Sequence, residues 1–338
     1  MARHGVAVAV IKDSLYAVGG ATDPGHVGPT GQSEVLDLSG RAAAAPVTVN
    51  ASWHRVTAAP SKVEYAASAE VGGRIWLFGG IGADETATAQ IAAFDRVLNT
   101  WTPGPKLPRP VHHATAVNYK GEPVVIGGFL PGAALTSVAS DHVYALRGDK
   151  WVRLPPLEHA RGAAAAAVVG DRIVVVGGQA DGKLVPETEV FDGRRWTDAA
   201  RMPTPREHLG AASDGRYLYA VGGRQLSAAK NVGALERYDP ANDSWTKLAA
   251  MPKVVGSVAV TYVAGRVISV GGEGVTTASR AVQGYDVRRH AWAHLPALPK
   301  GRHGPAVTAL RGSLYAIGGA AAAGHVRPTQ DVYVLDFG

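Results

Sequence analysis

The chain has 338 residues, a length that suggests two ordinary domains but that a single array of repeats can also occupy. Hydrophobic residues make up 46% of the sequence and charged residues 18%, which excludes an intrinsically disordered chain. The sequence contains no cysteine, so disulfides, thiolate metal sites and cysteine nucleophiles are excluded as well.

The net charge of +6 is spread over the whole length, and no aromatic platform accompanies the basic residues, so we expect no nucleic-acid partner. No apolar stretch approaches 18 residues, so no membrane span is expected. The opening stretch MARHGVAVAV has too short an apolar run for a signal peptide. Two compartments remain open: the cytoplasm, or export with the signal segment removed.

One pattern recurs along the chain: an apolar run that ends in two glycines. The diglycines stand at 19–20, 79–80, 127–128, 177–178, 222–223, 271–272 and 318–319. A period near 48 residues, with many glycines and prolines between the runs, predicts a propeller or solenoid of strands.

Each unit predicts four strands. A run of small residues, such as 163–169, comes first, and a Gly/Asp turn leads to the apolar run before the diglycine. That second run is apolar on both faces, as in IVVVGG, which predicts a strand buried between neighbouring sheets. The third strand ends in an aromatic residue or Leu followed by Asp, as in Tyr238-Asp239, although the third unit has Tyr144-Ala145 instead. The fourth strand opens with a tryptophan: Trp53, Trp101, Trp151, Trp196, Trp245 or Trp292.

The diglycine, the aromatic-Asp pair and the tryptophan that follows resemble the kelch repeat over essentially the whole chain. The resemblance implies an all-β, seven-bladed kelch-like β-propeller in a single domain over 1–338. The expected blades are approximately 1–60, 61–108, 109–158, 159–203, 204–252, 253–299 and 300–338. The seventh unit stops at Phe337-Gly338 without its tryptophan strand, so we expect a last blade that is incomplete or three-stranded.

Topology places a candidate site where the first strands begin, because these strands ring the axis and the loops after the diglycines reach the same face. Kelch and other propeller proteins generally bind there, as the resemblance implies. The predicted ligand-binding residues lie at these strand starts or in these loops: Arg3, His4, Tyr65, His112, His113, Arg161, His208, Arg224, Arg302 and His303. Such a His/Arg-rich mouth is suited to a carboxylate, a phosphate or an acidic peptide.

The same residues have another interpretation. Kelch-like units often carry Arg and His before the first strand, so these side chains are also candidates for the framework. We expect Arg161→Ala and Arg302→Ala to weaken an anionic ligand with little change in melting temperature, and a large loss of stability would assign them to the framework. No cofactor is predicted. If a divalent metal binds, the seam candidates are His4, His26, His303 and His325.

Two functions remain open at the mouth. The first is a monomeric binding module for a protein, peptide or glycan. The alternative is an isomerase, lyase or hydrolase that acts on a polar, anionic small molecule such as a sugar acid. The catalytic candidates are Glu64, His113, Glu207 and His208. A closed pocket with Glu and His within about 3–4 Å of each other would favour catalysis, and a flat open rim would favour a partner protein.

Overall fold

The computed structural model describes residues 7–11, 14–18, 33–37, 52–131, 137–322 and 328–337. The chain forms two compact units, Met1–Thr48 and Val49–Gly338. The extent of one propeller domain over 1–338 therefore stays a prediction, and each unit is described by itself.

The first unit contains one antiparallel sheet of three strands, in the order β1-β2-β3. The strands are β1 (Ala7–Ile11), β2 (Ser14–Val18) and β3 (Ser33–Asp37). They match the first three strands predicted for the first unit of the sequence.

The second unit contains six antiparallel sheets of four strands, which we call blades I to VI. From the innermost strand outward, blade I has β6 (Ala67–Val71), β7 (Arg74–Phe78), β9 (Ile91–Asp95) and β10 (Thr100–Pro103); blade II has β11 (Thr115–Tyr119), β12 (Glu122–Ile126), β15 (Val143–Arg147) and β16 (Lys150–Arg153); and blade III has β17 (Ala165–Val169), β18 (Arg172–Val176), β21 (Thr188–Phe191) and β22 (Trp196–Ala199). Blade IV has β23 (Gly210–Ser213), β24 (Leu218–Val221), β25 (Leu235–Asp239) and β26 (Ser244–Leu248); blade V has β27 (Ala259–Val263), β28 (Arg266–Val270), β29 (Val282–Asp286) and β30 (Ala291–His294); and blade VI has β31 (Ala306–Leu310), β32 (Ser313–Ile317), β33 (Val332–Asp336) and β4 (His54–Val56).

Short elements lie before or after the main strands of blades I to IV. They are β5 (Val63–Glu64) with β8 (Ile81–Gly82), β13 (Phe129–Pro131) with β14 (Ser137–Ala139), β19 (Gln179–Ala180) with β20 (Lys183–Leu184), and the 3₁₀ turn η2 (Ala228–Lys230). No helix in the described ranges has the length and apolar character needed to cross a membrane.

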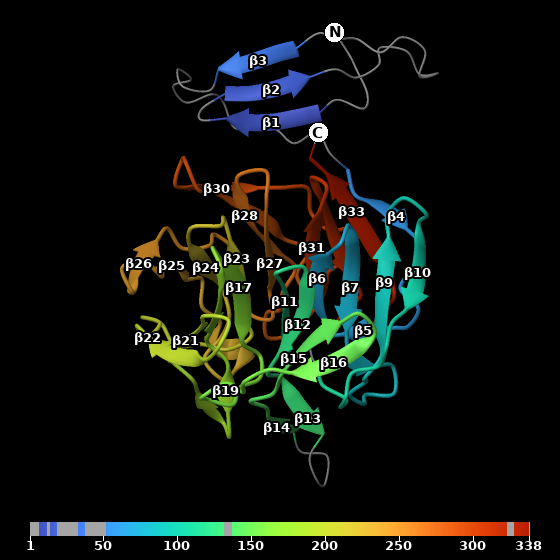
Figure 1. Ribbon diagram of the computed structural model, residues 1–338, viewed down its shortest axis with the longest axis vertical. Helices are drawn as coiled ribbons and strands as arrows, with labels where there is room; N and C mark the ends of the chain where they lie inside the picture. The colour runs from blue at the N-terminus through green and yellow to red at the C-terminus, as the bar shows by residue number, and fades with distance from the viewer. Residues whose placement is uncertain are drawn as a thin grey trace. The chain divides into compact units, whose positions relative to one another are not determined.

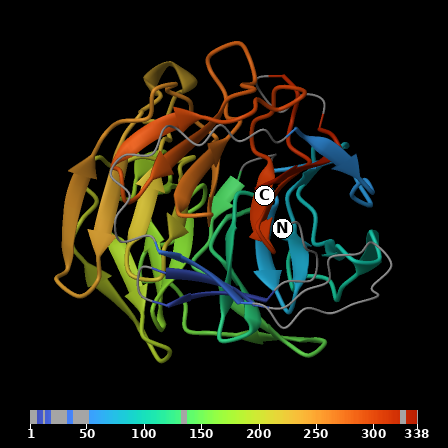
Figure 2. The ribbon, with the colours of Figure 1, turned by 90° about the horizontal axis from the view of Figure 1, so that it is seen from above.

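The blades of the second unit form a closed ring. Each innermost strand contacts the next, from β6 through β11, β17, β23, β27 and β31 and back to β6. Figure 1 shows the sheets of this unit from the side, and Figure 2 shows them following one another around a common axis. The all-β propeller is confirmed, but the prediction of seven blades is wrong, because the ring holds six.

The ring closes through β4, which supplies the fourth strand of blade VI. Val56 lies opposite Val332 and His54 lies opposite Val334, so a strand from the first half of the chain completes the last blade. The prediction of an incomplete or three-stranded last blade is therefore wrong. The sequence predicts that the strand after Trp53 belongs to the first blade, and this prediction is wrong. A fourth strand can pair with the free edge of any three-stranded unit, and the chain offers two such edges, β3 and β33.

The kelch signature residues hold neighbouring blades together. Each fourth-strand tryptophan donates its indole N–H to a backbone carbonyl in the link before its own blade, as Trp196 does to Pro155 at 2.9 Å. Trp53 does the same to Pro296 at 2.7 Å, which fixes β4 against the link between blades V and VI. An indole N–H that enters a core needs such a partner, so each contact orients a fourth strand.

The second strands of the blades and the strands around the axis have the residue types that the sequence predicts for them. The residues of β18 from Ile173 to Val176 have no exposed surface, as expected for a strand covered on both faces. The innermost strands carry small residues because six strands converge at the axis. A cavity of about 160 Å³ remains there, lined largely by alanine and valine from all six blades.

Candidate functional site: the axial mouth

One residue from each blade, just before the innermost strand, lines the mouth of the axis. These six axial residues share a left-handed backbone with φ between 49° and 55°: Tyr65, His113, Ala163, His208, Ser257 and Gly304. Their backbones join consecutive blades, since the amide of Tyr65 donates to Gly304 and the amide of His113 donates to Tyr65. The axial residues surround a cavity of about 100 Å³, which is the candidate site.

Three aromatic rings form one wall of this cavity. The Tyr65 ring stacks on His113 with centroids 3.7 Å apart, and His208 meets His113 edge-on at 4.7 Å. Burial and the nearby Glu273 carboxylate raise the pKa of Tyr65 far above its usual range. The Tyr65 hydroxyl is therefore protonated at neutral pH and acts as a hydrogen-bond donor.

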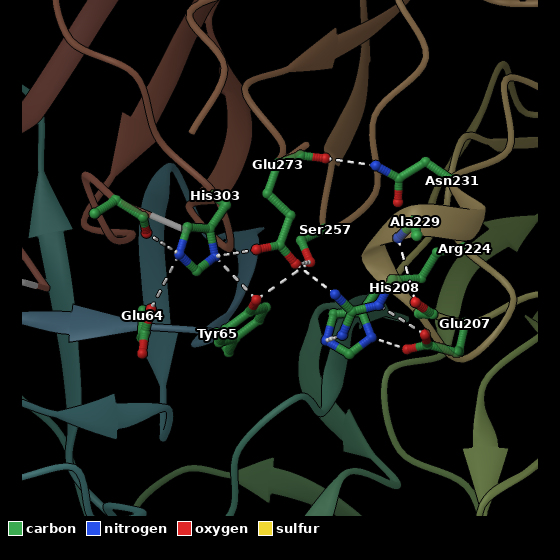
Figure 3. Close-up of polar contacts among 12 residues, drawn as sticks. Glu64, Tyr65, Glu207, His208, Arg224, Ala229, Asn231, Ser257, Glu273 and His303 are labelled. Atoms are coloured by element: carbon green, nitrogen blue, oxygen red, sulfur yellow. Dashed lines mark hydrogen bonds and ion pairs between the residues drawn. The ribbon is translucent and has the colours of Figure 1, made fainter. Parts of the chain in front are cut away.

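Arg224 organises the polar side of the mouth on blades IV and V (Figure 3). Its Nε donates to Oε1 of Glu207 at 2.8 Å, and its Nη1 donates to Oε1 of Glu273 at 2.5 Å. Glu207 also contacts Nδ1 of His208. Both carboxylates are almost fully buried, with exposed fractions of 0% and 4%, so the network is held in a low-dielectric environment.

A second chain of contacts links blades I, V and VI. Tyr65 Oη lies 2.9 Å from Nδ1 of His303 and 3.2 Å from Oγ of Ser257. The Ser257 hydroxyl in turn donates to Glu273 at 2.7 Å. The ring of His303 lies between two carboxylates, 3.9 Å from Glu64 and 3.7 Å from Glu273. The two chains share Glu273, so one continuous network spans the mouth.

His112 stands beside this network on blade II. Its Nδ1 lies 2.5 Å from Nδ1 of His113, and its Nε2 lies 3.2 Å from Oγ of Ser137. The structure therefore brings together most of the predicted mouth residues that it describes: Glu64, Tyr65, His112, His113, Glu207, His208, Arg224 and His303.

Arg161 and Arg302, which were expected at the mouth, are buried within their blades. Arg206 occupies the same position in blade IV. Each precedes its axial residue by two positions and is buried, with an exposed fraction of 1% or less. Arg161 pairs with Glu189 at 2.5 Å and Arg302 pairs with Asp331 at 2.8 Å. Their guanidinium groups pair with carboxylates of their own blades and not with the mouth network, which supports the framework interpretation.

Four predicted residues, Arg3, His4, His26 and His325, lie outside the described ranges. Among the residues that the structure describes, no three His, Asp or Glu side chains gather in a group that could hold a metal ion. Of the proposed seam cluster only His303 is described, and it contacts Tyr65 and the backbone carbonyl of Ala322.

Ser257 is an axial residue that the sequence reasoning missed. It connects Tyr65 to Glu273. A constant spacing would have found it, because every axial residue lies 14 positions before the first glycine of its diglycine, as Ser257 does before Gly271. Residue type gives no such signal, since the six axial residues are of five types.

Exposed apolar side chains lie close in sequence to three residues of the polar network. Leu226 follows Arg224, Val275 follows Glu273, and Val254 precedes Ser257; their exposed fractions are 46%, 66% and 47%. We call Leu226, Val254 and Val275 the apolar rim. The mouth thus combines a small buried polar cavity with an apolar border on blades IV and V.

The fold and the mouth define a six-bladed β-propeller with a candidate binding site at one end of its axis. A family model described as Kelch motif matches residues 160–203 and 205–252, which include blades III and IV. The chain is 27% identical over 234 residues to Kelch-like protein terF of Aspergillus terreus, covering 64% of this chain and 51% of that protein. It is 30% identical over 180 residues to human Kelch-like protein 34, covering 48% of this chain and 28% of that protein.

Beta-scruin of Limulus polyphemus is 29% identical over 220 residues, which covers 62% of this chain and 24% of beta-scruin. The solved structure of YjhT superposes with a TM-score of 0.73 at 17% identity, covering 82% of this chain and 95% of that one, and this likeness concerns the fold alone. The chain spans about half the length of terF and less of the other two relatives. The resemblance to the kelch-repeat β-propeller family is confirmed, and propellers of that family generally mediate protein interactions.

Proposed function

We propose that this protein binds a partner protein at the axial mouth, with one polar side chain of the partner entering the cavity beside Glu207, Arg224 and Glu273. The observation that carries the proposal is the apolar rim on the loops that hold this polar centre. Protein interfaces commonly place well-packed anchors at the centre of a patch, and an exposed apolar border supplies the surrounding contact.

The charges of the described mouth residues favour a basic side chain in the partner. The network holds three carboxylates and one guanidinium: Glu207 and Glu273 pair with Arg224, and Glu64 lies 3.9 Å from His303. The formal charge of these three carboxylates and the one guanidinium is −3 + 1 = −2. Arg161 and Arg302 pair with Glu189 and Asp331 outside this network, so the acidic ligand expected from the sequence has less support than a lysine or arginine.

A phage-displayed library of random peptides, selected on the full chain, tests the proposal. Selected peptides are expected to carry Lys or Arg beside an apolar residue and to bind Glu273→Gln and Val275→Glu at least tenfold more weakly. Val97→Glu is the matched control, because Val97 is 74% exposed in the β9–β10 turn, at the other end of its blade. Selected peptides that bind all three variants like the parent protein would refute the site.

A second candidate function is acid–base catalysis on a polar small molecule in the same cavity. It is favoured by two Glu–His arrangements, the contact between Glu207 and His208 and the position of His303 at 3.7 Å from Glu273. Such pairs hold an imidazole in the orientation that proton transfer requires. Arg224 would then take the carboxylate of a sugar acid in exchange for one of its glutamate partners.

Solvent exchange tests this second function directly. A panel of sugar acids and neutral sugars is incubated with the protein in D₂O, and loss of C–H signals next to carbonyl carbons is followed by NMR. Exchange that disappears in Glu207→Gln and persists in Val275→Glu would support catalysis at the mouth. Absence of exchange across the panel would leave peptide binding as the only function proposed for the mouth.

A further inference from the structure

The sheet of the first unit and the first three strands of blade VI have the same design. Strands β1, β2 and β3 begin and end 299 residues before β31, β32 and β33. Their pairing is also the same, since Ala7 lies opposite Val18 as Ala306 lies opposite Ile317, and the other pairs keep this offset. We call residues 3–38 the N-terminal copy and residues 302–337 the resident copy.

The two copies align without a gap. RHGVAVAVIKDSLYAVGGATDPGHVGPTGQSEVLDL and RHGPAVTALRGSLYAIGGAAAAGHVRPTQDVYVLDF share 20 of 36 residues. In both copies 14 residues separate the second strand from the third (19–32 and 318–331), whereas this interval is 12, 16, 11, 13 and 11 residues in blades I to V. The likeness therefore concerns these two units and is not a general property of the repeat.

The resident copy packs against blades V and I through side chains that the N-terminal copy keeps. Seven such core residues are identical in type at the offset of 299: Ala306, Val307, Leu314, Tyr315, Ala316, Val334 and Leu335. Leu310 and Ile317 become Ile11 and Val18, which preserve the apolar character with little change in volume. Val332 becomes the polar Ser33, so nine of the ten buried core residues of the resident copy stay apolar in the N-terminal copy.

Both copies require a fourth strand, and β4 alone completes one of them. The sheet β1-β2-β3 has three strands in the described ranges, whereas β33 pairs with β4. Asp37 precedes His54 by 17 positions, which is enough chain for β4 to pair with β3 as a hairpin with a long connection. Such an exchange leaves β4 and the Trp53–Pro296 contact unchanged.

We propose that the N-terminal copy is an alternative partner for the slot between blades V and I: residues 3–38 of the same chain replace residues 302–337 beside β4. In this second state β3 pairs with β4 in the register that β33 uses. Ser33 then lies opposite Val56, in the place of Val332.

Engineered disulfides test the exchange in the full chain, because the protein has no cysteine of its own. Val56→Cys/Val332→Cys reports the pairing in the structure, and Val56→Cys/Ser33→Cys reports the exchanged pairing. Directly opposed residues of antiparallel strands have the Cα separation that a disulfide needs. The control is Val56→Cys/Glu34→Cys, since residue 34 would present its side chain to the opposite face of the sheet.

After mild oxidation, peptide mapping and non-reducing gels give the yield of each disulfide within one chain. We expect the Ser33 pair to form at several times the yield of the Glu34 pair. Leu314→Ala, which weakens the resident copy, should raise the Ser33 yield, and Leu15→Ala at the equivalent position should lower it. Equal yields for the Ser33 and Glu34 pairs, or Ser33 disulfides found only between two chains, would overturn the proposal. Neither outcome bears on peptide binding at the mouth.

Discussion

Removing the buried guanidinium of Arg206 should destabilise the propeller strongly although no ligand contact is lost. Arg206 is fully buried and pairs with Glu236 at 2.6 Å. It also donates to three backbone carbonyls, those of Thr204, Ala220 and Gly222. Arg206→Met keeps most of the side-chain volume and leaves Glu236 as a buried carboxylate without its cation.

The expected cost follows from that unpaired charge. Removing one partner of a buried ion pair costs about 3–5 kcal/mol, whereas replacing both partners by apolar residues is often close to neutral. We expect Arg206→Met to lower the free energy of unfolding by about 3–5 kcal/mol, or the melting temperature by roughly 6–10 °C at about 2 °C per kcal/mol for a domain of this size. Arg206→Met/Glu236→Met should cost clearly less than Arg206→Met alone.

Urea and thermal unfolding, followed by tryptophan fluorescence, measure both variants beside Arg194→Met. Arg194 is an exposed turn residue, so its replacement should stay within about 0.5 kcal/mol. An Arg206→Met cost below about 1 kcal/mol would refute the argument that this arginine is part of the framework. A double variant as costly as the two single variants added together would refute the pairing argument.

Three further outcomes are expected. In chemical unfolding, Gly177→Ala should cost several times more stability than Gly215→Ala. Both glycines have positive φ, but only at Gly177 would a Cβ meet a backbone carbonyl, at 2.6 Å. Equal costs for the two variants would contradict this account. The backbone amides of Arg195 and Arg194 lower the pKa of Asp192, so the ionised carboxylate stabilises the fold above the ordinary Asp pKa and this stabilisation is lost as the pH falls through the lowered value. Asp192→Asn should therefore flatten the decrease in melting temperature between about pH 5 and 2.5. An unchanged slope would argue against this account of Asp192. Trp53→Phe removes the hydrogen bond to Pro296 and should cost about 1–3 kcal/mol, with faster proteolysis near β4 as a second measure; a variant as resistant as the parent would show that β4 is held by its strand pairing alone.

The blade architecture could be predicted from the sequence because its signals are local. The diglycine, the aromatic-Asp pair and the tryptophan each act within one blade or on the adjacent link, and Asp192 shows this by accepting hydrogen bonds from residues 194 and 195. Local chemistry of this kind repeats wherever the unit repeats. It identifies strands and turns without any knowledge of the ring.

The number of blades could not be predicted in the same way. Counting diglycines gives seven units, but the ring is decided by which three-stranded unit pairs with β4. That choice depends on long-range packing between residues such as Val56 and Val332, which are 276 positions apart. Two copies with nearly the same core residues leave the sequence pattern unable to distinguish them.

The site shows the same division between local and long-range information. Glu207, His208 and Arg224 were found from their places in the repeat, and the structure brings them together. Arg161 was placed at the mouth because it stands just before the first strand of its unit, yet it lies two positions before the axial residue Ala163 and is buried against Glu189. In this propeller, distance from the diglycine predicts which residue faces the axis, and residue type does not. A search for mouth residues in related propellers should therefore start from that spacing and only then consider side-chain chemistry.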